Sequence, residues 1–414
     1  MTFFRKISYL LVLLLFVPLV CEAEVPRISG FVETRDNEFF INGSGRFLFN
    51  GFNSYWMMTI AADPNQRYKI TNVFREASAT GLTVCRTWAF ADGGYGALQI
   101  APGIYNEDVF QALDFVIAEA NKYAVRLIMS LVNEWKDYGG KHQYVEWAKI
   151  NGANISSDDD FYTNPLTKTY YKNHVKRVLT RVNSITRIAY KDDPTIMAWE
   201  LMNEPRDQVD YTGKTVTAWT QEMASYAKSL DSKHLVEIGT EGFYGSSTPE
   251  RLEFNPGNYQ YGTDFITINQ IKDIDFTTIH AYPDMWFPGE NESEQVAFAQ
   301  RWLFSHWLDS NSILKKPLAI TEFGKSKKQP GYTVTMRDSY LNTIFTDIYD
   351  LASNYGGMAG SCVWQVLSEN MQNYNDGYGI VLSQDTLTRD VLFQQSKSMR
   401  SLEHKFVDQH GPNY

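Results

Sequence analysis

Short apolar runs alternate with longer segments of helical periodicity along most of this 414-residue chain. Eight of these runs are almost continuously apolar, which is the pattern of strands buried on both faces. They cover residues 49–53, 83–88, 126–131, 196–201, 235–239, 276–280, 317–321 and 360–364. Between them, residues 107–123, 170–190 and 215–230 carry apolar positions close to the helical period, which predicts helices.

The alternation of buried strands with helices predicts a parallel sheet covered by helices, and eight such units predict a closed (β/α)8 TIM barrel. The alternative is an open, doubly wound sheet, which usually carries a glycine-rich phosphate loop after its first strand. Residues 52–56 stand at that position and read Phe-Asn-Ser-Tyr-Trp. The barrel is therefore the favoured α/β fold.

Three further segments add to the barrel. Residues 31–48 read as an N-terminal β-hairpin around the turn Asn42-Gly43-Ser44-Gly45. Residues 138–165 and 243–275 read as long, loop-rich insertions, and loops that follow strands lie at the C-terminal face of such a barrel. The sequence carries no linker or short-period repeat, so residues 24–414 are expected to form a single domain.

The predicted strands end in polar or aromatic residues, whereas a purely structural role predicts apolar ends and generic turns. These ends include Arg86-Thr87-Trp88, Asn133-Glu134-Trp135, Asn203-Glu204-Pro205, Gly239-Thr240-Glu241, His280-Ala281-Tyr282, Glu322-Phe323-Gly324 and Trp364-Gln365. Glu204 follows the fourth strand and Glu322 the seventh, so in a closed barrel they face each other across the mouth. Either glutamate alone is more often a solvated loop residue, but a facing pair of carboxyl groups is what cleavage of a glycosidic bond requires.

The ordered set of strand-end motifs resembles glycoside hydrolase clan A, and its family five in particular. The motifs that carry this likeness are Asn203-Glu204-Pro205, Thr321-Glu322-Phe323-Gly324, Arg86, His280-Ala281-Tyr282 and Trp364. Residues 132–140 and 199–206 are similar to the corresponding segments of plant endo-β-1,4-mannanases. The resemblance implies a retaining endo-1,4-β-mannanase that cleaves mannan, galactomannan and glucomannan in cell walls without a metal or organic cofactor.

The resemblance also assigns roles to the two glutamates and their neighbours. Glu204 matches the proton donor and base, and Glu322 matches the nucleophile. A retaining enzyme holds these carboxyl groups ~5–5.5 Å apart. Asn203 matches the residue that binds the sugar 2-hydroxyl group. Tyr282 matches the residue that holds and tunes the nucleophile. Arg86 matches a cation beside Glu322, which would favour the ionised carboxylate.

The remaining candidates are contacts of the sugar or of the catalytic pair. His280 matches a polar neighbour of the pair. Trp364 matches a platform beneath the sugar at the cleavage point, and Trp88 a sugar contact further along the cleft. Trp135 also stands at a strand exit, where its ring is placed to stack on a sugar face. Arg206 is expected to bind a sugar hydroxyl group, although an ordinary surface arginine is an equally good interpretation.

Trp56 and the two cysteines leave alternatives open. Trp56 fits either a further sugar contact or packing at the barrel rim. Cys85 and Cys362 lie in strand-like runs, where two buried free thiols are favoured over the disulfide that secretion would permit. The sequence shows no cysteine and histidine cluster with the spacing of metal ligands.

Charge narrows the class of partner. The formal net charge of −10 comes without a basic stripe, which argues against a nucleic acid and against a polyanionic substrate. A neutral polysaccharide fits this charge, and the enzyme is expected to act as a monomer.

The N-terminus predicts secretion. Arg5 and Lys6 precede an apolar run over residues 9–20, and Ala23 follows at the expected cleavage point, as in a signal peptide covering residues 1–23. A membrane anchor is disfavoured because the run is shorter than the ~20 residues that span a bilayer. Glycosylation sequons begin at Asn42, Asn154 and Asn291. The expected location is therefore the cell wall or apoplast, after signal cleavage and without membrane attachment.

Two rival functions remain open on this sequence. A mannan transglycosylase or an endo-β-glucanase would share the catalytic residues and differ in the loops around them. A non-catalytic wall-binding protein on the same barrel is disfavoured, because both glutamates are present.

Overall fold

A computed structural model describes residues 28–43 and 45–410, with backbone alone for residues 405–410. The predicted signal peptide at residues 1–23 lies outside the described residues. Within the described part, no helix is long and apolar enough to cross a membrane.

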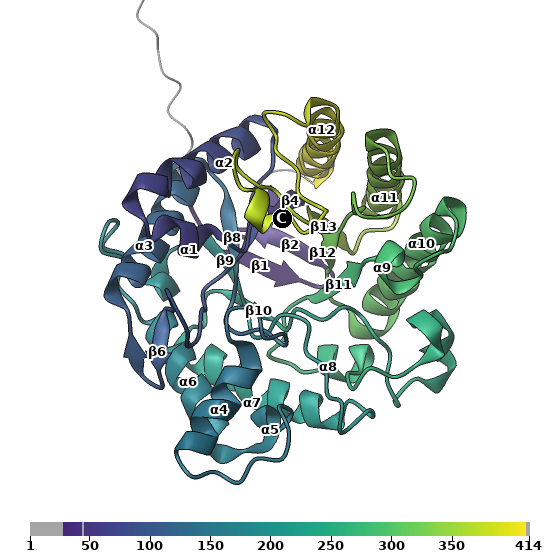
Figure 1. The fold of residues 1–414 in the computed structure, drawn as a ribbon. Coiled ribbons are helices and arrows are strands. Elements are labelled where there is room, and N and C mark those ends of the chain that lie inside the picture. The colour runs from purple at the N-terminus through teal and green to yellow at the C-terminus, as the bar shows by residue number, and fades with distance from the viewer. Residues whose placement is uncertain (1–27, 44, 411–414) are drawn as a thin grey trace, which may run out of the picture.

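Eight parallel strands form the central barrel, in the order β10-β9-β8-β5-β4-β13-β12-β11 (Figure 1). The strands are β4 (Phe49–Asn53), β5 (Val84–Trp88), β8 (Arg126–Ser130), β9 (Ile196–Glu200), β10 (Leu235–Glu237), β11 (Thr277–Ala281), β12 (Leu318–Phe323) and β13 (Met358–Val363). Hydrogen bonds from Asp275 N to Val236 O (2.8 Å) and from His280 N to Glu241 O (3.1 Å) join the two outermost strands and close the barrel. The predicted fold and all eight predicted strands are confirmed, with small differences at their ends.

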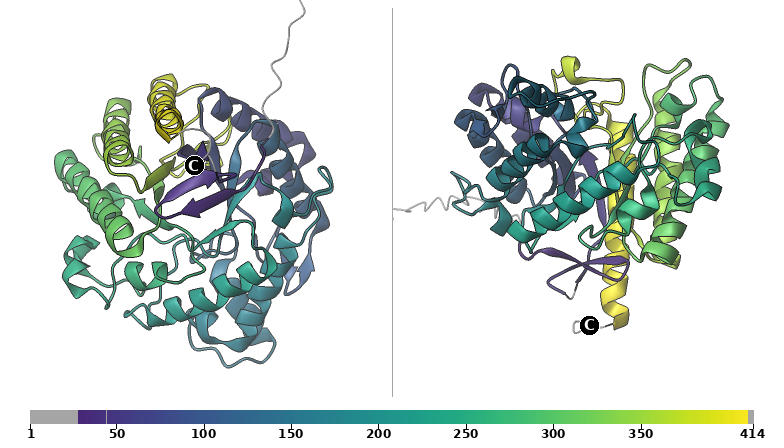
Figure 2. Two further views of the ribbon diagram at one scale, coloured as in Figure 1. Left: turned by 180° about the vertical axis from the view of Figure 1, so that it is seen from behind. Right: turned by 90° about the horizontal axis from the view of Figure 1, so that it is seen from below.

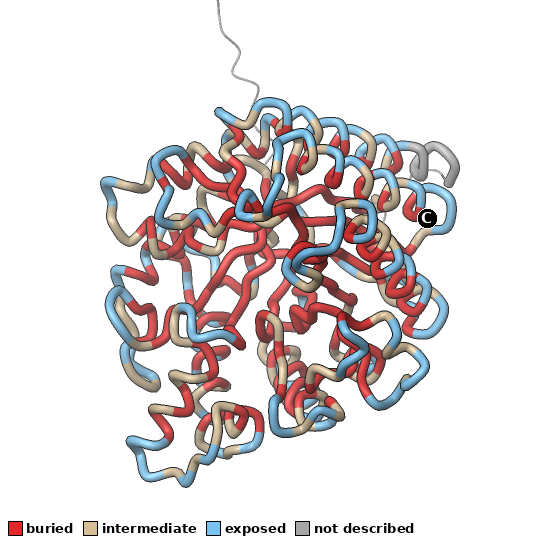
Figure 3. The backbone as a smooth tube through the Cα atoms, turned by 45° about the vertical axis from the view of Figure 1, so that its right-hand side comes forward, coloured by how far each residue is buried: buried red, intermediate tan, exposed pale blue. Residues whose placement is uncertain are grey.

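Helices surround the barrel, and their outer faces are exposed while the strands are buried (Figure 3). The longer helices are α2 (Arg67–Ala79), α3 (Glu107–Lys122), α6 (Pro165–Leu179), α7 (Lys214–Leu230), α10 (Glu292–Asp309), α11 (Val334–Asn354) and α12 (Thr386–His410). The shorter ones are α1 (Met57–Ala61), α4 (Gly140–Ile150), α5 (Asp160–Thr163), α8 (Phe265–Asn269) and α9 (Pro283–Trp286). Short 3-10 helices and one π-helical segment, η5, complete the set: η1 (Pro64–Gln66), η2 (Tyr190–Asp192), η3 (Pro249–Phe254), η4 (Pro256–Asn258), η5 (Ser310–Leu314) and η6 (Gln372–Tyr374).

The helix predicted over residues 170–190 has the wrong bounds. It begins at Pro165, because the Asn164 side chain accepts a hydrogen bond from the Leu166 amide and caps the helix. It ends at Leu179, after which the Arg181 guanidinium pairs with Asp114 on α3 at 2.6 and 2.9 Å. This contact with a neighbouring helix draws the chain out of the helical path.

The two predicted insertions differ from each other. Residues 138–165 were expected to be rich in loops, yet they contain α4 and α5, so this prediction is wrong in part. Residues 243–275 are mostly irregular, with η3, η4 and the short helix α8. A small hairpin of β6 (Gln99–Ala101) and β7 (Ile104–Tyr105) was not predicted.

The N-terminal hairpin covers the end of the barrel where the strands begin (Figure 2). It is a three-stranded sheet of β1 (Val32–Arg35), β2 (Glu38–Ile41) and β3 (Gly45–Arg46). Phe39 packs edge-to-face on Phe276 at 5.2 Å between ring centroids and lies 6.5 Å from Phe49. This apolar plug closes the lower end of the barrel and leaves the opposite end for the functional site. Cys85 and Cys362 are buried free thiols, as predicted.

Candidate active site

A cleft of about 660 Å³ lies at the C-terminal ends of the barrel strands. Its lining residues are Tyr55, Trp88, Asn133, Trp135, Asp137, Tyr138, Asn203, Glu204, Arg206, Glu241, Tyr282, Met285, Trp286, Glu322, Trp364, Asp376 and Tyr378. Most of the residues proposed from the sequence belong to this lining. The other two, Arg86 and His280, are buried and contact the lining glutamates from beneath.

Glu204 enters the cleft from the turn that follows β9. Its backbone has a φ of 51°, and such a left-handed conformation costs a non-glycine residue about 1–3 kcal/mol. The turn is held by a hydrogen bond of 2.9 Å from the Glu204 amide to Gly239 O. Trp135 Nε1 donates to Glu204 Oε2 at 2.6 Å, and His280 Nδ1 lies 2.7 Å from Oε1. Burial lowers the pKa of His280, which favours its neutral form.

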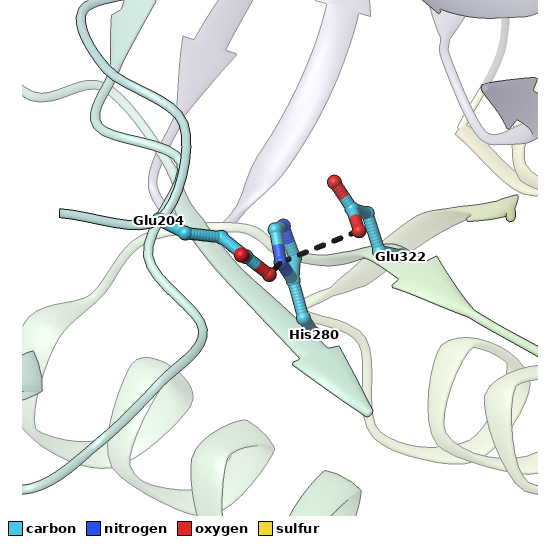
Figure 4. A group of neighbouring side chains, drawn as sticks. All are labelled: Glu204, His280 and Glu322. Carbon is cyan, nitrogen blue, oxygen red and sulfur yellow. Dashed lines mark hydrogen bonds and ion pairs between the residues drawn. The ribbon is translucent and has the colours of Figure 1, made fainter. Parts of the chain in front are cut away.

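Glu322 ends β12 and has a different set of partners. Arg86 Nη1 donates to Oε1, and Tyr282 Oη donates to Oε2 at 2.6 Å. His280 Nδ1 is 3.7 Å from Oε2, so the imidazole lies between the two carboxylates (Figure 4). The site brings one oxygen of Glu204 and one of Glu322 within 4.8 Å of each other.

Arg86 fixes several polar groups beneath the cleft. It is buried, and it donates to Glu200 from Nε at 2.5 Å and from Nη2 at 2.7 Å. The same guanidinium donates to Asn203 Oδ1 at 2.6 Å and to Asn53 Oδ1 at 3.1 Å, besides its bond to Glu322. A planar guanidinium with donors in a fixed fork holds each of these partners in one orientation.

The charges of the two candidate carboxylates are set by opposing effects. Burial raises the pKa of Glu204, and the hydrogen bond from Trp135 opposes this rise. Burial raises the pKa of Glu322 as well, and His280 and Arg86 oppose it. Arg86 donates directly to Glu322, where its charge favours the ionised carboxylate, and burial acts in the opposite direction. Of the two carboxylates, Glu322 is the one that Arg86 contacts directly, so the cation favours ionisation of Glu322 over that of Glu204.

One wall of the cleft is aromatic. Tyr55 stacks on Trp364 with ring centroids 5.6 Å apart, and Trp88 lies 4.8 Å from Tyr55. Tyr138 completes this wall edge-to-face against Trp88 at 5.2 Å. Trp364 is held from its edge, where Nε1 donates to Asp376 Oδ2 at 2.6 Å. Flat apolar rings with polar edges suit the faces and hydroxyl groups of sugars.

Arg206 and Glu241 form the opposite wall. Arg206 donates to both oxygens of Glu241 at 2.7 Å, and its guanidinium lies 5.1 Å from the ring centre of Trp135. Burial, and then the charge of Glu204, raise the pKa of Glu241 to about 7. Arg206 lines the cleft, and its predicted contact with a sugar hydroxyl group stays a prediction.

The sequence did not single out several residues of this site. Tyr55 stacks on Trp364, whereas its neighbour Trp56, considered as a sugar contact, is buried and donates to Val366 O at 3.2 Å. Glu200 was read only as part of a motif, yet it is the bidentate partner of Arg86. The signal that could have found Glu200 is its charge, because an ionisable residue inside an apolar strand is almost always paired.

Glu204, His280 and Glu322 are also close enough to hold a cation. Every oxygen of the two carboxylates, however, already has a hydrogen-bonding partner within the protein. The arrangement is therefore better suited to proton transfer and nucleophilic attack than to cation binding.

Comparisons with known proteins add a second line of evidence. The sequence profile of the GH family 5 beta-mannosidase-like family matches residues 29–370. The chain is 57% identical to mannan endo-1,4-beta-mannosidase 5 of Solanum lycopersicum, over 97% of this chain and 98% of that protein. It is 51% identical to mannan endo-1,4-beta-mannosidase 7 of Arabidopsis thaliana, over 92% of this chain and 88% of that protein. The crystal structure of the endo-1,4-beta-mannanase from Rhizomucor miehei superimposes with a TM-score of 0.75 and 29% identity, over 90% of this chain and 100% of that one.

Proposed function

Because the chain belongs to the GH family 5 beta-mannosidase-like family, we propose that it is an endo-1,4-β-mannanase that retains the configuration of the cleaved sugar. Its substrates are the internal β-1,4 bonds of mannan, galactomannan and glucomannan. The observation that carries the mechanism is the pair of carboxylates, Glu322 buried and Glu204 partly buried, with oxygens within 4.8 Å. This separation is closer to the ~5–5.5 Å of retaining glycosidases than to the ~6.5–9.5 Å of inverting ones.

In the first step, Glu322 attacks the anomeric carbon of the mannosyl unit. Arg86 and Tyr282 each donate to one oxygen of Glu322, which keeps it ionised and aimed into the cleft. Glu204 carries the proton of the pair and gives it to the departing glycosidic oxygen. The bond to the leaving chain breaks as the ester bond to Glu322 forms.

In the second step, Glu204 acts as the base. Once Glu322 is an ester, its negative charge no longer opposes ionisation of Glu204. Glu204 takes a proton from water, the oxygen of that water attacks the anomeric carbon, and Glu322 leaves as a carboxylate. Two displacements at one carbon restore the original configuration.

The other cleft residues bind the sugar chain. Asn203 is oriented by Arg86 Nη2 at 2.6 Å and by its own donation to Asn133 Oδ1 at 2.9 Å, and we assign it to the 2-hydroxyl group. Trp364 supports the sugar at the cleavage point, and Trp88 supports a neighbouring sugar. His280 holds the carboxyl group of Glu204 toward the bond that breaks.

Trp135 and Arg206 bind the part of the chain on the far side of that bond. Trp135 stacks on the sugar while its Nε1 holds Glu204. Arg206 offers one of its remaining donors to a hydroxyl group, with Glu241 keeping it in place.

The protein is proposed to act outside the cell as a single-domain monomer. Residues 1–23 are removed as a signal peptide, and residues 24–414 form the mature enzyme of the cell wall or apoplast. The sequon residues Asn42, Asn154 and Asn291 are exposed, which glycosylation requires. N-terminal sequencing of the secreted protein should begin near residue 24, and deglycosylation should lower its apparent mass.

The activity is tested with purified enzyme on galactomannan, glucomannan and carboxymethylcellulose. Release of manno-oligosaccharides, with mannobiose and longer products early, would support the proposal. Faster cleavage of carboxymethylcellulose would make the enzyme a β-glucanase. Mannose as the sole early product would contradict the endo mode. With a manno-oligosaccharide as the substrate, products longer than that oligosaccharide would show transglycosylation.

A further inference from the structure

A second pair of carboxyl groups lies beneath the catalytic pair, inside the barrel. Glu200 ends β9 and Glu237 ends β10, and the two residues are partners in the register of these parallel strands. Both are fully buried, and both carboxyl groups lie against Gly239: its amide donates to Glu237 Oε2, and a Cβ atom there would lie 2.7 Å from Glu200 Cδ. Two ionised carboxylates have only acceptor atoms, so a hydrogen bond between such neighbours requires a proton on one of them.

The distribution of donors shows which of the two carries that proton. Glu200 Oε1 accepts from Arg86 at 2.7 Å and from Ser130 Oγ at 2.5 Å, and Oε2 accepts from Arg86 at 2.5 Å. Glu237 Oε2 accepts from the Gly239 amide and from Thr278 Oγ1 at 3.3 Å. Glu237 Oε1 has no donor among the described residues, which is the place of the hydroxyl group of a neutral carboxylic acid.

Charge balance leads to the same assignment. The groups that face Glu237 are Arg86 from β5, Glu200 from β9, the Gly239 amide after its own strand, Thr278 from β11 and Cys362 from β13. Arg86 is the only cation in this set, and it already contacts Glu200 and Glu322. Two ionised carboxylates already exceed this one positive charge, and a third would add further uncompensated negative charge to the barrel interior. Burial and then the charge of Glu200 raise the pKa of Glu237 well above its ordinary value, in agreement.

The packing around the pair is close. A Cβ atom added at Gly239, where φ is 60°, would lie 2.5 Å from Met202 O and 2.7 Å from Glu200 Cδ. The backbone after β10 therefore lies directly on the Glu200 carboxyl group and holds it in place.

We propose that Glu237 is a positioning residue that works as a neutral carboxylic acid, donating its hydrogen to Glu200 so that Glu200 is the single anion clamping Arg86. Arg86 is thereby free to direct Nη1 at Glu322. An ionised Glu237 would compete for the guanidinium and push Glu322 toward its protonated form, in which it is not a nucleophile. The proposal deepens the proposed function, because it rests on Glu322 as the nucleophile.

Infrared difference spectroscopy of the enzyme without substrate tests the proton directly. The spectrum of the parent minus that of Glu237→Gln should contain a carboxylic-acid C=O band that shifts in D2O. Glu33→Gln, which removes an exposed glutamate of β1, is the control for the band of an ionised carboxylate. A carboxylate band in the Glu237 difference would overturn the proposal. This measurement is independent of activity, so an enzyme inactive on mannan would refute the function and leave the proton assignment standing.

Kinetics test the positioning role. Glu237→Gln keeps a neutral donor, so kcat should fall by no more than about tenfold with little change in KM. Glu200→Gln removes the anion that clamps Arg86, and kcat should fall by about a hundredfold or more. Equal losses in the two variants would contradict the proposed division of charge.

Should Glu237→Gln not fold, Glu237→Met provides a second uncharged side chain. Failure of both to fold would also count against a neutral Glu237, because neither changes the charge of the barrel.

Discussion

The two halves of the barrel interior are built from the same strands and differ sharply in chemistry. In the lower half, where the strands begin, the interior is lined by Phe49, Val84, Ile128, Leu235, Phe276, Ala319 and Ala359. Val32, Phe39 and Phe47 of the hairpin cover these residues. In the upper half, where the strands end, the interior is lined by Asn53, Arg86, Glu200, Glu237, His280 and Glu322, all of them buried. One half is an apolar core that holds the fold, and the other is a polar network that orients the proposed catalytic pair.

The comparison teaches where stability and chemistry reside in this enzyme. Burying charged groups carries a desolvation penalty, and an ion pair recovers it only when its geometry is good. The lower half offsets that penalty with apolar and aromatic packing. Substitutions in the lower half should therefore change the free energy of unfolding, whereas those in the upper half should change catalysis as well.

Replacing the central cation should give the largest effect. Arg86→Met leaves Glu200 and Glu322 as buried carboxyl groups without a cation. We expect the free energy of unfolding to fall by about 3–5 kcal/mol, and kcat of the folded fraction to fall at least about a thousandfold. Chemical denaturation and initial rates on galactomannan measure the two effects.

The matched control for Arg86 is another buried bidentate arginine. Arg181 pairs with Asp114 at 2.6 and 2.9 Å on the outer side of the barrel. Arg181→Met should lower stability and leave kcat of the folded enzyme near that of the parent. A similar loss of kcat in both variants would mean that Arg86 acts only through stability.

Removing a ring from the apolar half should act on stability alone. Phe39 is completely buried against Phe49 and Phe276, so Phe39→Ala should lower the free energy of unfolding by about 3–5 kcal/mol. Phe304→Ala is the control, because 53% of that side chain is exposed. Denaturation curves and kcat at a temperature where each variant is folded are the measurements. A loss of kcat in folded Phe39→Ala would refute the separation of the two halves.

Removing one hydroxyl group next to Glu322 should act on the chemical step. Tyr282 Oη donates to Glu322 Oε2 at 2.6 Å, and Phe keeps the ring while removing this donor. We expect kcat to fall by about 10–100-fold with a much smaller rise in KM. A change confined to KM would make Tyr282 a sugar-binding residue instead.

The smallest expected effect is a shift of the pH profile. Trp135 Nε1 stabilises the ionised form of Glu204, so Trp135→Phe should raise the pKa of Glu204 further above its ordinary value. In the proposed mechanism Glu204 is protonated at the start of the reaction, so activity should fall as pH rises through this pKa. The alkaline limb of kcat/KM should therefore move to higher pH by up to about one unit, and movement to lower pH would contradict the assignment.

The barrel was predictable from the sequence because each strand is an almost unbroken apolar run. This pattern is local and can be recognised without knowing which strands lie beside it in the sheet. The helix over 165–179 was misplaced because its start depends on the Asn164 cap and its end on Arg181 reaching another helix. Apolar periodicity reveals neither contact, because the cap is made by a polar side chain to the nearby Leu166 amide and the Arg181–Asp114 pair joins segments 67 residues apart.

The candidate site divides in the same way. Glu204 and Glu322 were predictable because each stands at a strand exit within a recognisable motif, and the structure places them together. The choice between Tyr55 and Trp56 depends on the path of an irregular turn, which the sequence does not specify. The role of Glu237 depends on its register with Glu200 across two strands that are paired only in the fold.

Azide rescue of the two alanine variants tests the central claim most directly, namely that Glu204 is the acid and base and Glu322 the nucleophile. The substrate is a mannoside with a dinitrophenolate leaving group, which departs without a proton. With Glu204→Ala the covalent intermediate should form and accumulate, and azide should release it as the β-mannosyl azide. With Glu322→Ala no intermediate forms, and direct displacement by azide should give the α-mannosyl azide. Product anomers determined by NMR would contradict the account if the two configurations were exchanged, or if either variant kept normal activity on polymeric mannan.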